Sequence, residues 1–192
     1  MSKSDPAAAK KERNKQIRWV VTIFLTTILI SGTISFVSDE IMEGSGTVTA
    51  FLILLFIILI GIIFDVVGVA VTSADEKPFH SMAARKVPGA QESIRLLRNA
   101  ERVSSICNDV IGDICGVVSG SASATIAARI LSNLEFSWPQ LVSLLMSALV
   151  AGLTVGGKAI GKTFAVNSCI TIVHTVGRVI HSWNGLWKKK KK

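Results

Sequence analysis

Two long stretches with almost no charged side chain dominate the pattern of apolar and polar positions. Residues 19–37 contain no charge, and residues 48–72 contain only Asp65. A helix needs about 20 mainly apolar residues to cross the hydrocarbon core of a bilayer. At a rise of about 1.5 Å per residue, the second stretch would reach about 37 Å, which is enough for a tilted span. Both stretches therefore predict membrane-spanning helices.

The first stretch has a second interpretation, as the hydrophobic region of a secretory signal peptide. It follows a basic, polar segment, residues 10–18, as such a region does. Two features favour a retained span instead. The stretch is about as long as a full span requires, and no small-x-small cleavage site follows it. We therefore expect residues 1–18 to form a basic N-terminus in the cytoplasm.

A third stretch, residues 103–131, is apolar but less uniform. It contains Asn108, Asp109, Asp113 and Arg129, so hydropathy alone does not identify it as a span. Its small residues recur every four positions, a spacing that allows close helix packing in membranes. They include Gly112, Gly116 and Gly120. The stretch predicts a third span that packs closely against other helices.

Residues 140–157 predict a fourth span. It begins beside Pro139, and proline is tolerated in the first turn of a helix. The following segment, residues 163–187, is apolar but interrupted by polar residues, and it ends with Trp183 and Trp187. Because tryptophan is enriched at membrane interfaces, we expect a helix along the cytoplasmic interface rather than a fifth span.

Charge sets the orientation of these spans. Of the 192 residues 49% are hydrophobic and the mean hydropathy is +0.52, yet the formal net charge is +8. Of the 21 Lys and Arg residues, six precede the first span, six lie between the second and third, eight follow the fourth, and one is Arg129. The loops at 38–47 and 132–139 carry acidic residues and no cation. The positive-inside rule then places both termini in the cytoplasm.

These patterns exclude a soluble enzyme as the leading interpretation. They predict an all-α integral membrane protein, multi-pass in the plasma (inner) membrane, with four transmembrane helices and juxtamembrane cytoplasmic helices. Cations beside the spans are expected to bind anionic lipid headgroups, at about 1 kcal/mol each. They are Arg95, Arg98 and Arg102 in the middle loop, and Lys188, Lys189 and Lys190 in the polylysine tail, residues 188–192. No nucleic acid is expected, because no aromatic platform accompanies the basic blocks.

Three carboxylates within the predicted spans carry the candidate chemistry. A carboxylate at membrane depth is costly, so it usually faces the interior of a helix bundle and marks an ion or proton path. Helical spacing places small and acidic residues on shared faces of three helices. These faces are Gly61, Asp65 and Gly68; Asp109, Gly112, Asp113 and Gly116; and Gly152 and Gly156. We expect the three helices to approach closely along these faces.

Such an arrangement can bind a hard cation such as Mg²⁺, which prefers oxygen ligands and often keeps several waters. The candidate ligands are Asp65, Ser105, Asn108, Asp109, Asp113 and Ser119. The alternative is structural. In that case solvent hydrates Asp109 and Asp113, or Lys158 or Lys162 neutralises them in plain salt bridges. The residues alone leave both interpretations open.

Other chemistry is not expected. The three cysteines are odd in number and form no CxxC, and the three histidines are scattered, so neither a disulfide framework nor a zinc site is predicted. No nucleophile and base are arranged for catalysis. We expect a protein that is not an enzyme and has no organic cofactor.

Four short segments between residues 61 and 180 carry a resemblance to a known family. They are 70–73 (AVTS), 88–90 (PGA), 96–102 (LLRNAER) and 156–166 (GGKAIGKTFAV). In this order they resemble the transmembrane domain of the CorB/CorC magnesium and cobalt transporters, whose animal relatives are the cyclin M (CNNM) proteins. The first segment resembles the family's S-x-x-E-x-A-L-x-S helix end. The last resembles its F-G-E-x-x-P-K-T-x-A segment.

The resemblance implies a core of three membrane helices with a juxtamembrane helical belt, working as a homodimer. Residues 48–187 would form this core, and residues 19–37 an extra N-terminal span. In the family, a polar pocket binds the ion through serine, asparagine and glutamate side chains. We expect the family's cytoplasmic CBS domains to be missing here. The matching positions depart from the family at Asp65 (serine), Gly68 (glutamate), Lys158 (glutamate), Gly161 (proline), and Gly112 or Asp113 (asparagine).

Two functions follow as expectations. The first is a small CorB-like protein that transports or binds divalent cations of the Mg²⁺/Co²⁺ class through a polar pocket between membrane helices. The second is a non-transporting scaffold or regulatory subunit that keeps the fold, has lost the ion site and acts on a membrane protein partner.

Overall fold

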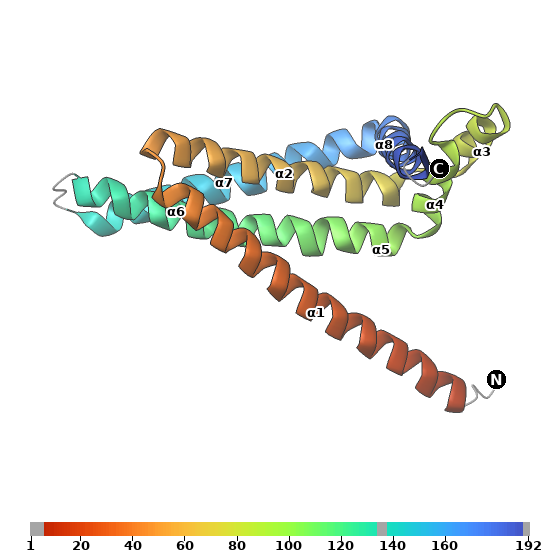
Figure 1. Cartoon of the computed structure of the whole chain (residues 1–192), viewed down its shortest axis with the longest axis horizontal. Helices are drawn as coiled ribbons and strands as arrows, with labels where there is room; N and C mark the ends of the chain where they lie inside the picture. Colours follow the sequence, from red (N-terminus) through yellow and green to blue (C-terminus); the bar gives the residue numbers. More distant parts are fainter. Residues whose placement is uncertain (1–5, 134–137, 190–192) are drawn as a thin grey trace.

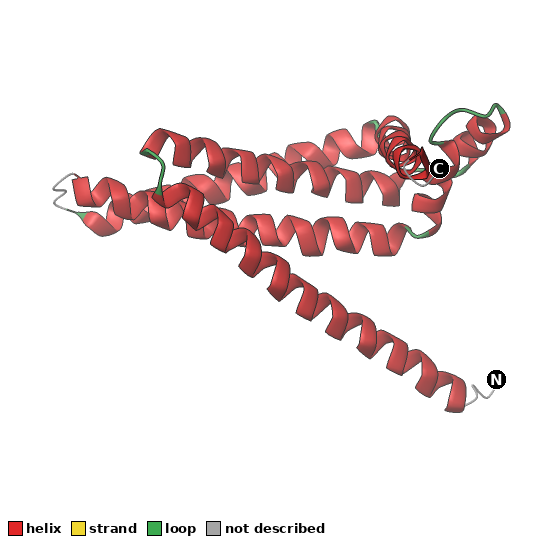
Figure 2. Ribbon diagram, viewed as in Figure 1, coloured by secondary structure: helices red, strands yellow, loops and turns green. Residues whose placement is uncertain are grey.

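The chain folds as a bundle of long helices with shorter helices at one end (Figures 1 and 2). The computed structural model describes residues 6–133 and 138–189, and every regular element in this part of the chain is a helix. The elements are α1 (Pro6–Glu43), α2 (Thr47–Ser73), α3 (Lys77–Ala84), α4 (Ala90–Arg98), α5 (Ala100–Ser105), the π-helix η1 (Ile106–Gly112), α6 (Asp113–Asn133), α7 (Pro139–Asn167) and α8 (Cys169–Lys189).

Four segments are long and apolar enough to cross a bilayer. They are Gln16–Met42, Thr47–Ser73, Ala100–Ser132 and Pro139–Asn167. The third segment is continuous through α5, η1 and α6. The prediction of an all-α, multi-pass membrane protein with four candidate spans is therefore confirmed.

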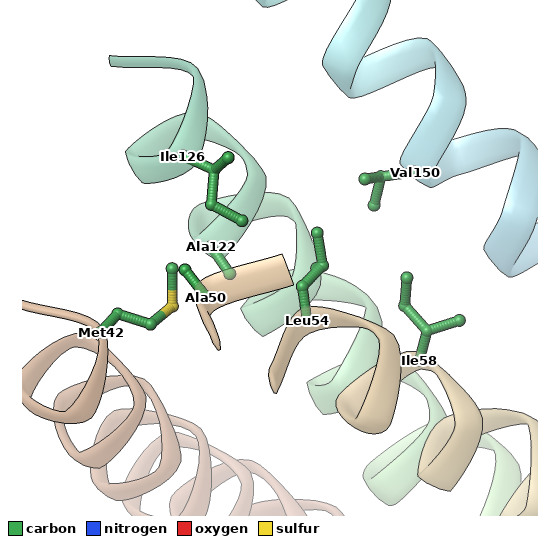
Figure 3. Close-up of a cluster of buried hydrophobic side chains, with 7 residues drawn as sticks. All are labelled: Met42, Ala50, Leu54, Ile58, Ala122, Ile126 and Val150. Atoms are coloured by element: carbon green, nitrogen blue, oxygen red, sulfur yellow. The ribbon is translucent and has the colours of Figure 1, made fainter. Parts of the chain in front are cut away.

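Helix α2 lies at the centre of the bundle and packs against α6, α7 and α8. One buried cluster joins the ends of α1, α2 and α6 to α7 (Figure 3). It consists of Met42, Ala50, Leu54, Ile58, Ala122, Ile126 and Val150. A second cluster lies between α2 and the η1–α6 segment, and a third joins α2 and α7 to the short helices α3 and α4 and to α8. Three apolar clusters along α2 therefore hold the bundle from end to end.

Helix α1 diverges from this bundle. Its 38 residues would reach about 57 Å at the helical rise, and Figure 1 shows it crossing α6 and extending away from the other helices. Ser38 and Met42 near its C-terminal end are buried, whereas apolar side chains such as Phe24 and Leu29 are exposed. In a bilayer these exposed side chains face lipid, where they carry no hydrophobic penalty.

The N-terminal end of α1, the C-terminal end of α8 and the helices α3 and α4 all lie at one end of the bundle (Figure 1). The α1–α2 connection and the facing ends of α6 and α7 lie at the other end. This arrangement matches the expected separation of cation-rich and cation-free segments. The assignment of the first end to the cytoplasm stays a prediction.

The helix ends differ from the expected ones in two places. Helix α7 continues to Asn167 without a break at the paired glycines near its middle, of which Gly157 packs against Ile62 of α2. The helix expected over 163–187 therefore begins at Cys169, after a break at Ser168 where φ is −119° and ψ is 21°. Helix α1 also extends beyond the expected span at both ends.

Helix α8 is fastened to α4 by an unusually close backbone contact. A Cβ added to Gly177 would lie 2.5 Å from the carbonyl oxygen of Gly89 and also against the Ser93 hydroxyl. The buried Ser93 hydroxyl donates toward the carbonyl oxygens of Gly89, at 2.9 Å, and of Val173, at 3.2 Å. Gly89 itself has φ of +88°, a left-handed conformation that favours glycine. Both glycines are required for this contact.

A hydrogen bond between side chains supports the same contact and makes it sensitive to pH. His181 Nδ1 lies 3.0 Å from Glu92 Oε1. Burial alone would raise the pKa of Glu92, but the hydrogen bond from His181 brings that pKa below its ordinary value of 4.5. A lowered carboxylate pKa stabilises the folded state above the ordinary value, and this contribution is lost as pH falls through the lowered pKa.

We therefore expect α8 to loosen from α4 when the pH falls below about 4.5. Limited proteolysis in detergent, followed as the pH is lowered from about 6 to about 3, would detect release of α8. The Glu92→Gln variant should lack this acid-dependent step. An identical pH profile in the variant would mean that Glu92 does not hold α8.

Candidate functional site

The candidate site lies where α2 and the η1–α6 segment approach most closely. A Cβ added to Gly61 would lie 2.9 Å from the Cβ of Cys115, so a larger residue there would push the helices apart. Two turns further along α2, Gly68 lies against the side-chain amide of Asn108. Between these contacts, Asp65 faces Gly112. Small residues thus bring the two backbones together on both sides of one buried carboxylate.

Asp65 is only 4% exposed. Its Oδ1 atom lies 3.9 Å from Lys158 Nζ, the ammonium nitrogen of a lysine on α7. Its Oδ2 atom is buried and has no hydrogen-bond partner in the part of the chain that the structure describes. A buried polar atom without a partner costs about 1–3 kcal/mol, more when it is charged. Asp65 is therefore a carboxylate with unused capacity to accept a ligand.

The ammonium nitrogen of Lys158 lies near three oxygen atoms of the site. This atom, Nζ, lies 3.5 Å from the carbonyl oxygen of Gly112, 3.9 Å from Asp65 Oδ1 and 4.0 Å from Asp113 Oδ1. Charged hydrogen bonds between an ammonium and a carboxylate are usually about 2.7–2.9 Å long. The ammonium group is therefore near all three oxygens but bound tightly to none of them. The Asp113 side chain is 72% exposed, so the Lys158 ammonium group can move toward solvent by following the Asp113 carboxylate.

The π-helix η1 ends at this site. Gly112, its last residue, is buried and presents its carbonyl oxygen to Lys158. π-Helical turns are rare and occur frequently at functional sites, because the wider turn shifts the register of the side chains that follow. This shift in register explains why the sequence-based prediction, with Asp109 and Gly112 on the same inner face of the third span, is wrong. Gly112 faces the interior, whereas Asp109 is exposed.

Asn108 provides a second buried oxygen on the same interface. Its Nδ2 donates to Ser104 Oγ at 3.1 Å, which turns Oδ1 toward Gly68. This Oδ1 atom is buried and has no hydrogen-bond partner among the described residues. Two acceptor atoms, one on Asp65 and one on Asn108, are thus left without a donor on neighbouring turns of the α2–η1 interface.

The structure brings together only part of the expected ligand set. Asp65 and Asp113 share Lys158, and Asn108 lies one turn away. Asp109 is exposed, Ser105 is half-buried, and the buried Ser119 donates to the carbonyl oxygen of Cys115 at 2.6 Å. Within residues 6–133 and 138–189, no group of three or more His, Cys, Asp or Glu residues is arranged to hold a metal ion.

The glycines on α7 also differ from the expected ones. A Cβ added to Gly152 or Gly156 would meet no atom within 4 Å, so these residues do not line the contact with α2. Gly157 packs against Ile62 instead, and a Cβ added to Gly161 would lie 2.7 Å from Val66 Cγ2. The expected stripe is wrong by about one residue, because equal spacing does not reveal which glycine faces the neighbouring helix.

The expected lipid-binding cations in the middle loop are exposed. Arg98 Nε lies 3.8 Å from Glu76, and the Arg102 guanidinium stacks over the Trp19 ring of α1 at 5.4 Å. Arg95 is also exposed. The side chains of Lys188 and Lys189, and the whole of Lys190, lie outside the described residues. Binding of lipid headgroups by all six cations stays a prediction.

The comparisons with known proteins provide no family for this chain. No protein-family model, no curated protein and no solved structure matches it. The chemistry of the Asp65 site therefore has to be argued from the chain's own residues.

Proposed function

We propose that the protein binds a cation at Asp65 within the membrane and moves it across. One observation carries the proposal: Asp65 is a buried carboxylate, inside the candidate membrane span Thr47–Ser73, whose second oxygen has no partner among the described residues. Acidic residues in this situation are expensive to keep and usually line ion or proton paths. The neighbouring π-helix and the unpartnered Asn108 oxygen support a ligand site over a closed core.

Lys158 supplies the charge that Asp65 needs when no cation is bound. A lysine is a compact charge on a flexible stem, and the Lys158 side chain is 21% exposed. When a cation occupies Asp65, the ammonium group can shift toward Asp113, which is at the solvent-exposed side of the same cluster. In this mechanism the cation and the ammonium group alternate at one buried carboxylate, so the bundle interior never holds an unpaired charge.

The ion class follows from the resemblance only. It implies Mg²⁺ or Co²⁺ in a plasma (inner) membrane protein that forms a homodimer, and the cation distribution favours cytoplasmic termini. Asn108 and Asp113 are the proposed additional oxygen ligands beside Asp65 for such an ion, and ligation by Ser105, Asp109 and Ser119, which the structure does not bring to Asp65, stays a prediction.

A second function has its own supporting observation. Lys158 already contacts the carboxylates of Asp65 and Asp113. If that contact is permanent, the cluster is a structural element, and the protein is a scaffold or regulatory subunit for a membrane protein partner. The two functions differ in one property, since the scaffold moves no ion when it is reconstituted alone.

A flux assay tests the proposal. In proteoliposomes loaded with Mg²⁺, Na⁺ and pH reporters, we expect the wild-type chain to carry a cation flux and Asp65→Asn to reduce it by about tenfold or more. Asp39→Asn, at an exposed position on α1, is the matched control and should transport normally. The double variant Asp65→Asn/Lys158→Met should lose the same flux. It removes the Lys158 ammonium group as well, so no buried charge is left without its partner. Equal flux in wild-type and Asp65→Asn proteins would contradict the proposal.

A further inference from the structure

We infer that the cation taken by Asp65 is monovalent. The inference rests on the proposed function, that Asp65 takes a cation, and it replaces the divalent class implied by the resemblance with a monovalent one. It uses three features of the site: its net charge, the type of its free oxygens, and the space that Gly68 leaves beside Asn108.

The net charge of the buried site is suited to an ion of charge +1. Asp65 contributes one negative charge, and the Lys158 ammonium group balances it from 3.9 Å. A monovalent cation at Asp65 replaces that ammonium charge one for one. A divalent ion would leave one uncompensated positive charge inside the bundle, which is strongly unfavourable in a membrane. Asp113 does not remove this difference, because its side chain is 72% exposed and its charge is hydrated.

Only one of the two oxygen atoms at the site that lack a partner in the described part of the chain belongs to a charged side chain. Sites for divalent ions combine several carboxylates, and ligand charge sets much of their affinity. Here the unpartnered acceptors are one carboxylate oxygen, on Asp65, and one neutral amide oxygen, on Asn108. Among the described residues, no group of three or more acidic, histidine or cysteine side chains is arranged to hold a metal ion by itself. One carboxylate combined with neutral carbonyl-type oxygens resembles the donor sets by which membrane proteins bind alkali cations.

Gly68 makes the amide oxygen available. Asn108 Oδ1 lies so close to Gly68 that it would collide with any Cβ there. The Asn108 side chain is held in this position by its hydrogen bond to Ser104 Oγ. In Gly68→Ala the amide has to turn away, so one neutral oxygen leaves the site while the buried charges stay. Gly68 is thus a positioning residue for ion affinity.

Ion-dependent thermal stability of the purified full chain tests the inference. LiCl, NaCl, KCl and MgCl₂ would be titrated at constant ionic strength, balanced with N-methylglucamine chloride, and flux would be measured for the same ions. We expect one alkali cation to stabilise the wild-type protein with a half-saturating concentration about tenfold or more below that of Mg²⁺. Asp65→Asn should abolish this stabilisation, and Gly68→Ala should raise the half-saturating concentration about tenfold. Gly120→Ala is the matched control, because a Cβ at Gly120 meets no atom within 4 Å.

The outcomes separate the two claims. Alkali-specific stabilisation that is lost in Asp65→Asn and weakened in Gly68→Ala supports the inference. Saturable binding and flux of Mg²⁺ with no alkali effect overturns the inference and leaves the proposed function standing. No Asp65-dependent effect of any ion, in stability or flux, overturns both. An unchanged alkali affinity in Gly68→Ala removes the role of Asn108 and Gly68.

Discussion

Lys158→Met should lower the free energy of unfolding by about 3 kcal/mol at neutral pH. The substitution removes the ammonium group that lies 3.9 Å from Asp65 Oδ1 and leaves a 4% exposed carboxylate with no opposite charge beside it. Breaking a buried ion pair on one side typically costs about 3–5 kcal/mol, and we expect the lower limit because Lys158 is 21% exposed. Reversible unfolding in detergent, followed by circular dichroism, measures the change.

Two further variants identify the cause of the loss. Lys162→Met, one turn along α7 at an exposed position, should leave stability unchanged. Asp65→Asn/Lys158→Met should recover most of the lost stability, because replacing both partners of a buried pair is often close to neutral. If the double variant were as unstable as the single one, Lys158 would stabilise the bundle through packing and not through its charge.

Gly89→Ala should lower stability by about 3 kcal/mol, from two contributions. A non-glycine residue at φ of +88° costs about 1–2 kcal/mol, and overpacking adds about 1–3 kcal/mol. The added Cβ would lie 2.5 Å from the backbone nitrogen of Arg178, and a backbone atom can move aside only if α8 moves. The loss should therefore appear as faster amide hydrogen exchange throughout α8, measured by mass spectrometry.

Gly152→Ala is the control for this prediction. A Cβ at Gly152 meets no atom within 4 Å, and alanine is the better helix former, so α8 should exchange as in the wild-type protein. Faster exchange in α2 rather than α8 in the Gly89→Ala variant would mean that the α4–α8 contact is not a separate unit.

The spans could be predicted from sequence because a bilayer imposes a minimum length and excludes charge. Those constraints also make Asp65 conspicuous, as the only charge in its stretch. Lys158 was a candidate partner because it lies at the end of the fourth predicted span. The structure places its ammonium group beside both Asp65 and Asp113.

Other parts of the site depend on features that regular spacing does not contain. Spacing arguments assume about 3.6 residues per turn, and the π-helix η1 breaks that assumption just before Asp113. Asp109 was consequently placed on the inner face, although it is exposed. The contact of Gly89 with Gly177 joins residues far apart in the chain, so no local spacing pattern predicts it.

The most direct test of the account is an infrared difference spectrum of the reconstituted protein as a cation is added and removed. We predict that the carboxylate stretching bands shift as the cation replaces Lys158 beside Asp65, and that the shift disappears in Asp65→Asn but persists in Asp39→Asn. A cation-induced spectrum that is identical in wild-type and Asp65→Asn proteins, or no cation-induced change at all, would contradict the claim that Asp65 is the cation-binding carboxylate.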